Sequence, residues 1–297
     1  MKDFAAGDVG ASSQSSTAEI RPDLTRFDQL RANPPSVLVV PPDACEIHPS
    51  SLDDIFKAIG LLKDQFESDK PPSSQFIHVM NIPSPLLNKI ENDTGLFQGV
   101  QAHIVHKQSE ILLKISPGRD HESITERFAE EIKTKLRSMG VATWNGEFEA
   151  IGSTRIYGDS SSKEPAWAMA PKNTINPSLV LEVGFSQSYA SLLNDAAWWY
   201  SNANTKVIVL ISISHSPVLH VAFEVWSEVP NTSLAPFTKS RPQQVLQCTQ
   251  RAQYQDGQIT GGPLTIPFDN ILNRAPRGIE QDIILSPAIL AHIGAEA

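Results

Sequence analysis

The spacing of apolar residues predicts a mixed α/β fold for residues 98–297. Apolar side chains recur every four positions from Ile124 to Leu136, which predicts an amphipathic helix over residues 121–139 that ends at Gly140. A second helix is predicted over residues 189–201. Short apolar runs predict strands over residues 100–105, 111–115, 148–157, 166–170, 177–184, 206–213 and 218–226. The order of these elements favours a mixed central sheet flanked by helices.

The remaining segments give a three-part organisation. Residues 1–33 are small and polar and predict a mobile tail. Residues 34–97 predict an N-terminal α/β extension, with strands over 37–40 and 76–80 and a helix that begins at Ser50 or Ser51. Residues 98–297 form the predicted core, in which the stretch after Trp226 is expected to be rich in loops. Short runs near Leu264 and Asp282 and a terminal helix are expected to pack back on the sheet.

One carboxylate interrupts the most apolar of these runs. Glu182 lies in the middle of Pro177-Ser-Leu-Val-Leu-Glu-Val-Gly184, which is typical of a strand buried on both faces. A buried carboxylate must be paired, hydrogen-bonded, protonated or bound to a metal ion, since desolvating it alone costs on the order of several kcal/mol. Glu182 is therefore the first candidate for a functional residue. The alternative is a structural pair with Lys163 or Arg155.

Composition narrows the range of partners. The chain has 297 residues, 40% of them hydrophobic, and a formal net charge of −9. A protein that grips nucleic acid through its phosphates usually has a basic surface, so nucleic-acid binding would need a local basic patch or a bound cation. No apolar segment approaches the roughly 20 residues needed to cross a bilayer. With two cysteines far apart in the sequence, we expect an intracellular protein, nuclear or cytoplasmic, that has no membrane partner.

Four short motifs, taken in order, resemble a known nuclease family. They are His121-Glu122, Lys163-Glu164-Pro165, Glu182-Val183-Gly184-Phe185-Ser186 and Asp195-Ala196-Ala197-Trp198-Trp199. Their order and spacing over residues 98–285 resemble a little-characterised branch of the PD-(D/E)XK superfamily, which has the restriction-endonuclease-like fold. In that family an Asp follows the Pro on one strand, and an acid-x-Lys follows on the adjacent strand.

The resemblance implies a DNA endonuclease that depends on Mg²⁺ or Mn²⁺. The metal-binding positions would be Glu182, Val183 and position 166, with Glu122 joining from the helix. The chain departs from the family at Ala166, where the first metal-binding Asp is missing, and at Gly184, where the usual lysine is missing. Lys163 from the neighbouring strand and Gln187 could assist a water. We therefore expect cleavage to be lost or impaired, and Ala166→Asp to create or restore it.

A second hypothesis comes from a different functional class. A catalytically dead member of this fold could act as a module that binds nucleic acid or protein, including as a homodimer. A concave basic cleft around Lys163, Arg155 and Arg119 would favour nucleic acid, whereas a flat apolar patch would favour a protein partner. Glu122 also has a purely structural interpretation, because an acid at the start of a helix interacts favourably with the helix dipole.

Overall fold

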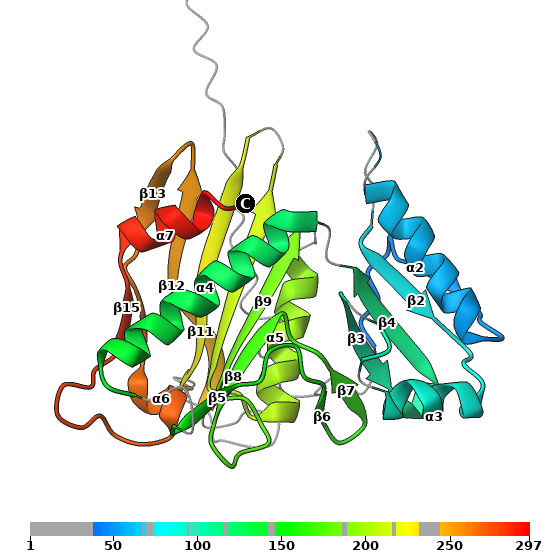
Figure 1. Ribbon diagram of the computed structural model, residues 1–297, viewed down its shortest axis with the longest axis horizontal. Coiled ribbons are helices and arrows are strands. Elements are labelled where there is room, and N and C mark those ends of the chain that lie inside the picture. The colour runs from blue at the N-terminus through cyan, green and yellow to red at the C-terminus, as the bar shows by residue number, and fades with distance from the viewer. Residues whose placement is uncertain are drawn as a thin grey trace, which may run out of the picture.

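The computed structural model describes residues 38–66, 68, 74–93, 95–97, 99–115, 118–141, 146–185, 189–215, 218–231 and 244–297. For residues 118–120 and 185 it describes the backbone alone. The described chain forms a mixed α/β fold in which two sheets lie next to each other (Figure 1). The predicted tail over residues 1–33 lies outside the described residues.

The larger sheet has seven strands and contains the Glu182 strand. Its strands are β5 (Phe148–Ala150), β8 (Trp167–Pro171), β9 (Leu179–Phe185), β10 (Val207–Ser214), β11 (His220–Pro230), β12 (Gln244–Gln255) and β13 (Gln258–Gly261). Their order is β13-β12-β11-β10-β9-β8-β5. β9 runs parallel to β10, and the other neighbours are antiparallel, so the predicted mixed sheet is confirmed.

Two helices cover opposite faces of this sheet. Helix α4 (Gly118–Ser138) lies over one face, with Ile124, Phe128 and Ile132 packed in one core cluster with Leu181 and Val183 of β9. Helix α5 (Tyr189–Ala203) covers the other face, where its apolar residues pack around Val180 and Ile208. Because successive side chains of a strand point to opposite faces, β9 contributes to both cores.

The smaller sheet has six strands in the order β1-β2-β4-β3-β7-β6. They are β1 (Cys45–Ile47), β2 (Phe76–Val79), β3 (Val100–Val105), β4 (Glu110–Ile115), β6 (Ile156–Tyr157) and β7 (Ser161–Lys163). Helices α2 (Leu52–Phe66) and α3 (Ser84–Asn92) pack on it, with a short 3₁₀ turn, η1 (His106–Gln108), between β3 and β4. The predicted hairpin is confirmed, and β2 pairs with β4. The sequence-based border at residues 97/98 therefore falls inside one sheet.

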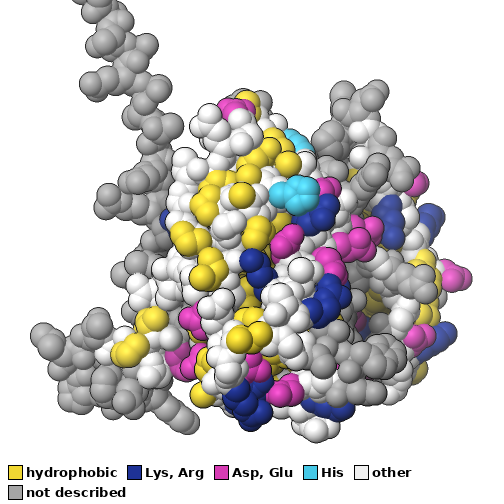
Figure 2. Space-filling view, turned by 60° about the vertical axis from the view of Figure 1, so that its left-hand side comes forward, with side chains coloured by type: hydrophobic (Ala, Val, Ile, Leu, Met, Phe, Trp, Pro, Cys, Tyr) yellow, Lys and Arg dark blue, Asp and Glu magenta, His cyan; other side chains and the backbone are white. Residues whose placement is uncertain are grey.

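The C-terminal elements pack on the same face of the large sheet as α4. Strands β14 (Leu264–Ile266) and β15 (Ile283–Leu285) pair with each other, and helices α6 (Phe268–Leu272) and α7 (Pro287–Gly294) pack in the same core cluster as α4. The predicted return of this segment onto the sheet is confirmed. Figure 2 shows that apolar side chains gather on this side of the molecule, while acidic and basic side chains are interspersed over the rest of that face.

Three expectations about secondary structure were wrong. Residues 38–40 form no strand, and residue 37 lies outside the described part. The strand predicted over 148–157 is divided between the two sheets, as β5 (Phe148–Ala150) in the larger one and β6 (Ile156–Tyr157) in the smaller one. The expected loop after Trp226 contains β12 and β13, because β12 alternates polar residues with inward-facing Leu246, Ala252 and Tyr254. Within the described residues, no helix is both long enough and apolar enough to cross a membrane.

Candidate functional site

Glu182 lies in the interior between the large sheet and α5. Its neighbours Leu181 and Val183 belong to the core cluster on the α4 face, so the carboxylate points to the α5 face. Only 1% of Glu182 is exposed. The indole Nε1 of Trp199, on α5, donates a hydrogen bond of 2.6 Å to Glu182 Oε1. The sequence therefore puts the carboxylate on a strand, and the helix supplies its first partner.

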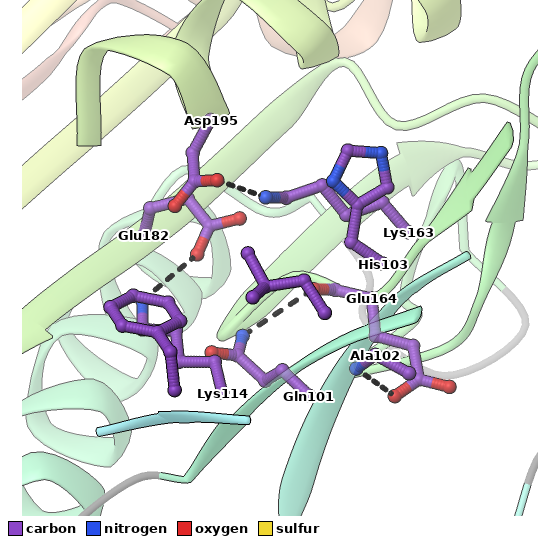
Figure 3. A pocket seen from close by; sticks show the side chains of 10 residues that line it. Gln101, Ala102, His103, Lys114, Lys163, Glu164, Glu182 and Asp195 are labelled. Atoms are coloured by element: carbon purple, nitrogen blue, oxygen red, sulfur yellow. Dashed lines mark hydrogen bonds and ion pairs between the residues drawn. The ribbon is translucent and has the colours of Figure 1, made fainter. Parts of the chain in front are cut away.

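Lys114 brings a positive charge to Glu182 from the other sheet. It belongs to β4 and is itself buried. Its Nζ donates a hydrogen bond of 2.7 Å to the carbonyl oxygen of Val183 and lies 3.8 Å from Glu182 Oε2 (Figure 3). Burial raises the pKa of Glu182 and lowers the pKa of Lys114, and the attraction between the two opposes both shifts.

A second ion pair lies beside the first. Lys163 at the end of β7 contacts the carboxylate of Asp195 on α5 through its Nζ, and both residues are largely shielded from solvent. Burial alone would raise the pKa of Asp195, but the ammonium groups of Lys163 and Lys114 lower it overall. His103 lies opposite Lys163 on β3, and desolvation together with that lysine lowers the pKa of His103 to about 3. The imidazole of His103 is therefore neutral near pH 7.

These side chains surround a small cavity. It has a volume of about 20 Å³ and is lined by Lys114, Lys163, Glu182 and Asp195, with Gln101 and His103 among the other lining residues. A polar space of this size accommodates about one water molecule. The cavity is therefore too small for a nucleotide.

Arg155 and Glu164 form a separate pair at the crossover, where the chain passes from β7 of the smaller sheet to β8 of the larger sheet. Arg155 Nε donates to Glu164 Oε1 over 2.9 Å, and its Nη1 donates to the carbonyl of Ile90 over 2.9 Å. The other carboxylate oxygen of Glu164 accepts from the backbone N–H of Ala102 over 3.1 Å. Both side chains are buried, and burial raises the pKa of Glu164 although Arg155 opposes the shift. Arg155 thus stabilises the junction and is not the partner of Glu182.

A much larger pocket lies on the α4 side of the same crossover. Its volume is about 600 Å³, and Ala166 and Glu122 both line it. The buried ring of His121 also lines it and hydrogen-bonds to the backbone of Val183. Burial and the nearby Lys114 lower the pKa of His121 to about 3, so the imidazole is neutral at pH 7. This is the space into which an Asp at position 166 would project.

The predicted site residues thus separate into two groups. Glu182 and Lys163 line the small cavity, and the carbonyl of Val183 is bonded to Lys114. Ala166 and Glu122 line the large pocket, and Gln187 lies outside the described residues. The separation has a simple cause: Glu122 belongs to the helix on one face of the sheet, whereas Glu182 points to the other face.

The arrangement does not fit a divalent metal ion. Lys114 occupies the position between the Glu182 carboxylate and the Val183 carbonyl, and Ala166 offers no side-chain oxygen. In the part of the chain that the structure describes, no group of three or more His, Cys, Asp or Glu side chains could hold a metal ion. A Mg²⁺ site needs several oxygen ligands in a nearly octahedral arrangement, which these residues do not supply.

Sequence reasoning missed Lys114 and the role of Asp195, although both carry a signal. Lys114 interrupts the apolar run Ile111-Leu-Leu-Lys-Ile115, just as Glu182 interrupts its own run. Asp195 is the one charged residue in the sequence of α5. Each would have been singled out by the principle that a charge inside an apolar element needs a partner.

Comparison with known proteins adds one structural similarity. No family model matches the sequence, and no curated protein matches it. A crystal structure from Anabaena variabilis, described as that of "a putative nuclease belonging to DUF820", is similar with a TM-score of 0.39 and 14% sequence identity. The similar region covers 65% of this chain and 90% of that chain.

Proposed function

We propose that this chain is a non-catalytic protein with a restriction-endonuclease-like framework, and that it acts as a binding module. The observation that supports this is the position of Lys114. Its ammonium group hydrogen-bonds to the carbonyl of Val183 and pairs with the carboxylate of Glu182. These are two of the positions that the PD-(D/E)XK resemblance assigns to a metal ion. A lysine of the protein itself takes the place of the metal ion.

A resident ammonium group and a divalent ion exclude each other at this position. The cation of Lys114 already balances part of the negative charge of Glu182, so a second cation would meet repulsion in a desolvated interior. Restoring an acid at position 166 alone would leave this obstacle in place. The side chain of Ala166 lines the other pocket, so an Asp there would join Glu122 rather than Glu182.

Activation of an attacking water is also missing. The family lysine position is Gly184, and Lys163, the nearest substitute, is paired with Asp195. Lys163 is bound to the carboxylate of Asp195 beside the small cavity, which has no room for a phosphate. Without a metal ion and without this lysine, the described residues neither activate an attacking water nor offset the charge that develops on a phosphate.

The described surroundings of the site do not offer a basic cleft for DNA. Lys163 and Arg155 are both buried and paired, and the side chain of Arg119 is outside the description. The large pocket carries Glu122 and Glu126, and the chain as a whole has a net charge of −9. These charges oppose a polyphosphate ligand. We therefore assign the binding function to a ligand other than a nucleic-acid backbone.

A direct experiment compares metal binding and cleavage in four proteins. They are the natural chain, Ala166→Asp, Lys114→Met and the double variant. Binding of Mn²⁺ and Mg²⁺ is measured by calorimetry. Cleavage of supercoiled plasmid and of single-stranded DNA is measured in the presence of each metal ion. Thermal unfolding confirms that each variant is folded. We expect neither tight metal binding nor cleavage by the natural chain or by Ala166→Asp.

Metal-dependent cleavage by the natural chain, lost in Glu182→Gln, would overturn the proposal. So would cleavage by the single variant Ala166→Asp, because that result would mean that one missing acid was the whole defect. The Glu182→Gln control is needed because a trace of contaminating nuclease would cleave DNA regardless of the state of residue 182.

A further inference from the structure

We propose that the small cavity beside Lys114 binds one ordered water molecule, which joins the side chains of Lys114, Glu182 and Gln101. These residues belong to β4, β9 and β3, so the water connects the smaller sheet to the larger one. The inference goes beyond the proposed binding function and does not depend on it, because it concerns the interior between the sheets.

The amino group of Lys114 has more donors than the described residues use. A charged lysine carries three N–H groups on Nζ. One of them donates to the carbonyl oxygen of Val183 over 2.7 Å. Oε2 of Glu182 lies 3.8 Å from Nζ, beyond the usual N–H···O distance of about 2.7–3.2 Å. The two groups therefore attract each other without a direct hydrogen bond, and a water molecule beside the pair can contact both atoms.

Two acceptors belong to the same cavity. Oε1 of Glu182 accepts from the indole of Trp199, whereas no described residue donates a hydrogen bond to Oε2. Oε1 of Gln101 is buried and likewise accepts no hydrogen bond from the described residues. The orientation of this amide is set by its other end, because Nε2 donates to the carbonyl of Glu164 over 3.4 Å. Figure 3 shows the amide oxygen of Gln101 on the side of Lys114.

One water molecule matches this set of atoms. It accepts from Lys114 Nζ and donates to Glu182 Oε2 and to Gln101 Oε1, which gives three hydrogen bonds, the usual number for a buried water. The cavity volume of about 20 Å³ exceeds the roughly 10–15 Å³ that a water molecule needs. A buried acceptor without a donor is costly, so the water removes a penalty at each of the two oxygens.

The charges around the cavity favour a neutral ligand over an ion. Two lysines and two carboxylates line it: Lys114, Lys163, Glu182 and Asp195. Glu164 also lines it and is balanced by Arg155. Moving a proton from a lysine to a neighbouring carboxylate leaves the sum of these charges unchanged at zero. A bound chloride or sodium ion would add an unbalanced charge in a desolvated interior, whereas water fits either protonation state.

The test is a crystal structure of the full chain at a resolution that shows ordered water molecules, with a second data set from crystals grown in sodium bromide. We expect a density peak about 2.7–3.2 Å from Lys114 Nζ and from Gln101 Oε1. We expect no anomalous bromide signal at that position. In the structure of Gln101→Met, which replaces the amide by an apolar group of similar length, the peak should be lost.

A measurement in solution complements the crystal structures. Relaxation dispersion of ¹⁷O-labelled water counts the water molecules that stay bound to the protein for long times. Gln101→Met should hold one fewer of them than the natural chain. The matched control is Gln253→Met, which removes an exposed amide from β12 outside the cavity and should leave the number unchanged. Thermal unfolding shows that both variants are folded.

Four results would overturn the proposal. One is a crystal structure of the natural chain that shows other buried waters and no peak in this cavity. Another is an anomalous bromide peak there, which would identify an anion site. The third is a peak of unchanged occupancy in Gln101→Met, because Gln101 would then not be a partner. The last is the same number of long-lived waters in Gln101→Met and in the natural chain. Cleavage of DNA tests the proposed function separately and does not bear on these results.

Discussion

Lys114 and Glu182 meet in the interior from two different sheets, with Nζ and Oε2 3.8 Å apart. Neither is exposed to bulk water, and each is partly neutralised by a second group: the carbonyl of Val183 for the lysine and the indole of Trp199 for the carboxylate. The pair therefore joins the two sheets in the interior of the fold.

The first prediction concerns this pair. Lys114→Met should destabilise the protein by about 3–5 kcal/mol, because it removes the ammonium group that lies 3.8 Å from the buried Glu182 carboxylate. The free energy of unfolding is measured by urea denaturation. In the double variant Lys114→Met/Glu182→Gln the loss should be smaller than the sum of the two single losses by about 1 kcal/mol or more. Strict additivity would show that the two groups do not interact.

The second prediction compares two adjacent tryptophans of α5. Trp199 donates to the carboxylate of Glu182 over 2.6 Å, and Trp198 donates to the hydroxyl of Ser161 over 2.8 Å. Both are almost fully buried, so a change to Phe removes similar volume from each. Trp199→Phe should cost about 1 kcal/mol more in unfolding free energy than Trp198→Phe, because hydrogen bonds to charged groups are stronger. Equal losses would mean that residue 182 is protonated near pH 7.

The third prediction concerns pH. The pKa of His121 is lowered from 6.5 to about 3 in the folded chain, so between these values only the unfolded chain takes up the proton. The stability contributed by the neutral ring is present above pH 6.5 and is lost as pH falls towards 3, by about 1.4 kcal/mol per pH unit. His121→Gln removes this titration and keeps a donor for Val183.

The measurement for that prediction is the difference in unfolding free energy between the natural chain and His121→Gln from pH 7 to pH 3. Burial raises the pKa values of Glu182 and Glu164, so these two groups add stability as pH falls. Their contribution is the same in both proteins and cancels in the difference. The natural chain should lose stability more steeply than the variant. Parallel pH profiles would show that the histidine is solvated.

The fourth prediction tests packing at α7 with two glycines. A Cβ added to Gly294 would lie 2.6 Å from Cγ and 2.8 Å from Cβ of Tyr254, close to the fixed root of that side chain. Gly294→Ala should therefore destabilise by about 1–3 kcal/mol. Gly60, in the interior of α2, has no neighbour within 4 Å of such a Cβ. Gly60→Ala should stabilise by about 0.5–1 kcal/mol. Thermal and urea unfolding measure both, and the same sign for the two variants would contradict the packing at α7.

The elements with strong periodicity could be predicted from the sequence. The four-residue repeat from Ile124 to Leu136 gave the helix within three residues of its start, and the apolar run around Glu182 gave a central strand. β12 was missed because its polar positions are mostly glutamine, so the alternation is present without the usual β-branched residues. Which sheet the hairpin of β3 and β4 joins is decided by long-range pairing with β2, which the local pattern does not contain.

Only part of the candidate site could be predicted from the sequence. A buried charge stands out in an apolar run, so Glu182 could be identified, and Lys114 carries an equal signal. What the sequence could not give is the direction of the side chains. Glu122 and Glu182 lie on opposite faces of one sheet, and this follows only from how α4 and α5 pack on β9. The motif order alone implied that they would converge.

The ammonium group beside Glu182 also constrains how such a protein can change over time. If an ancestor held a metal ion there, losing the acid at position 166 could be reversed by one substitution, but a lysine that has since become part of the interior cannot be removed without loss of stability. Recovery of metal binding would then require both an acid at position 166 and the loss of Lys114. The loss of Lys114 would be harmful on its own. In that case the buried lysine would make the loss of metal binding difficult to reverse.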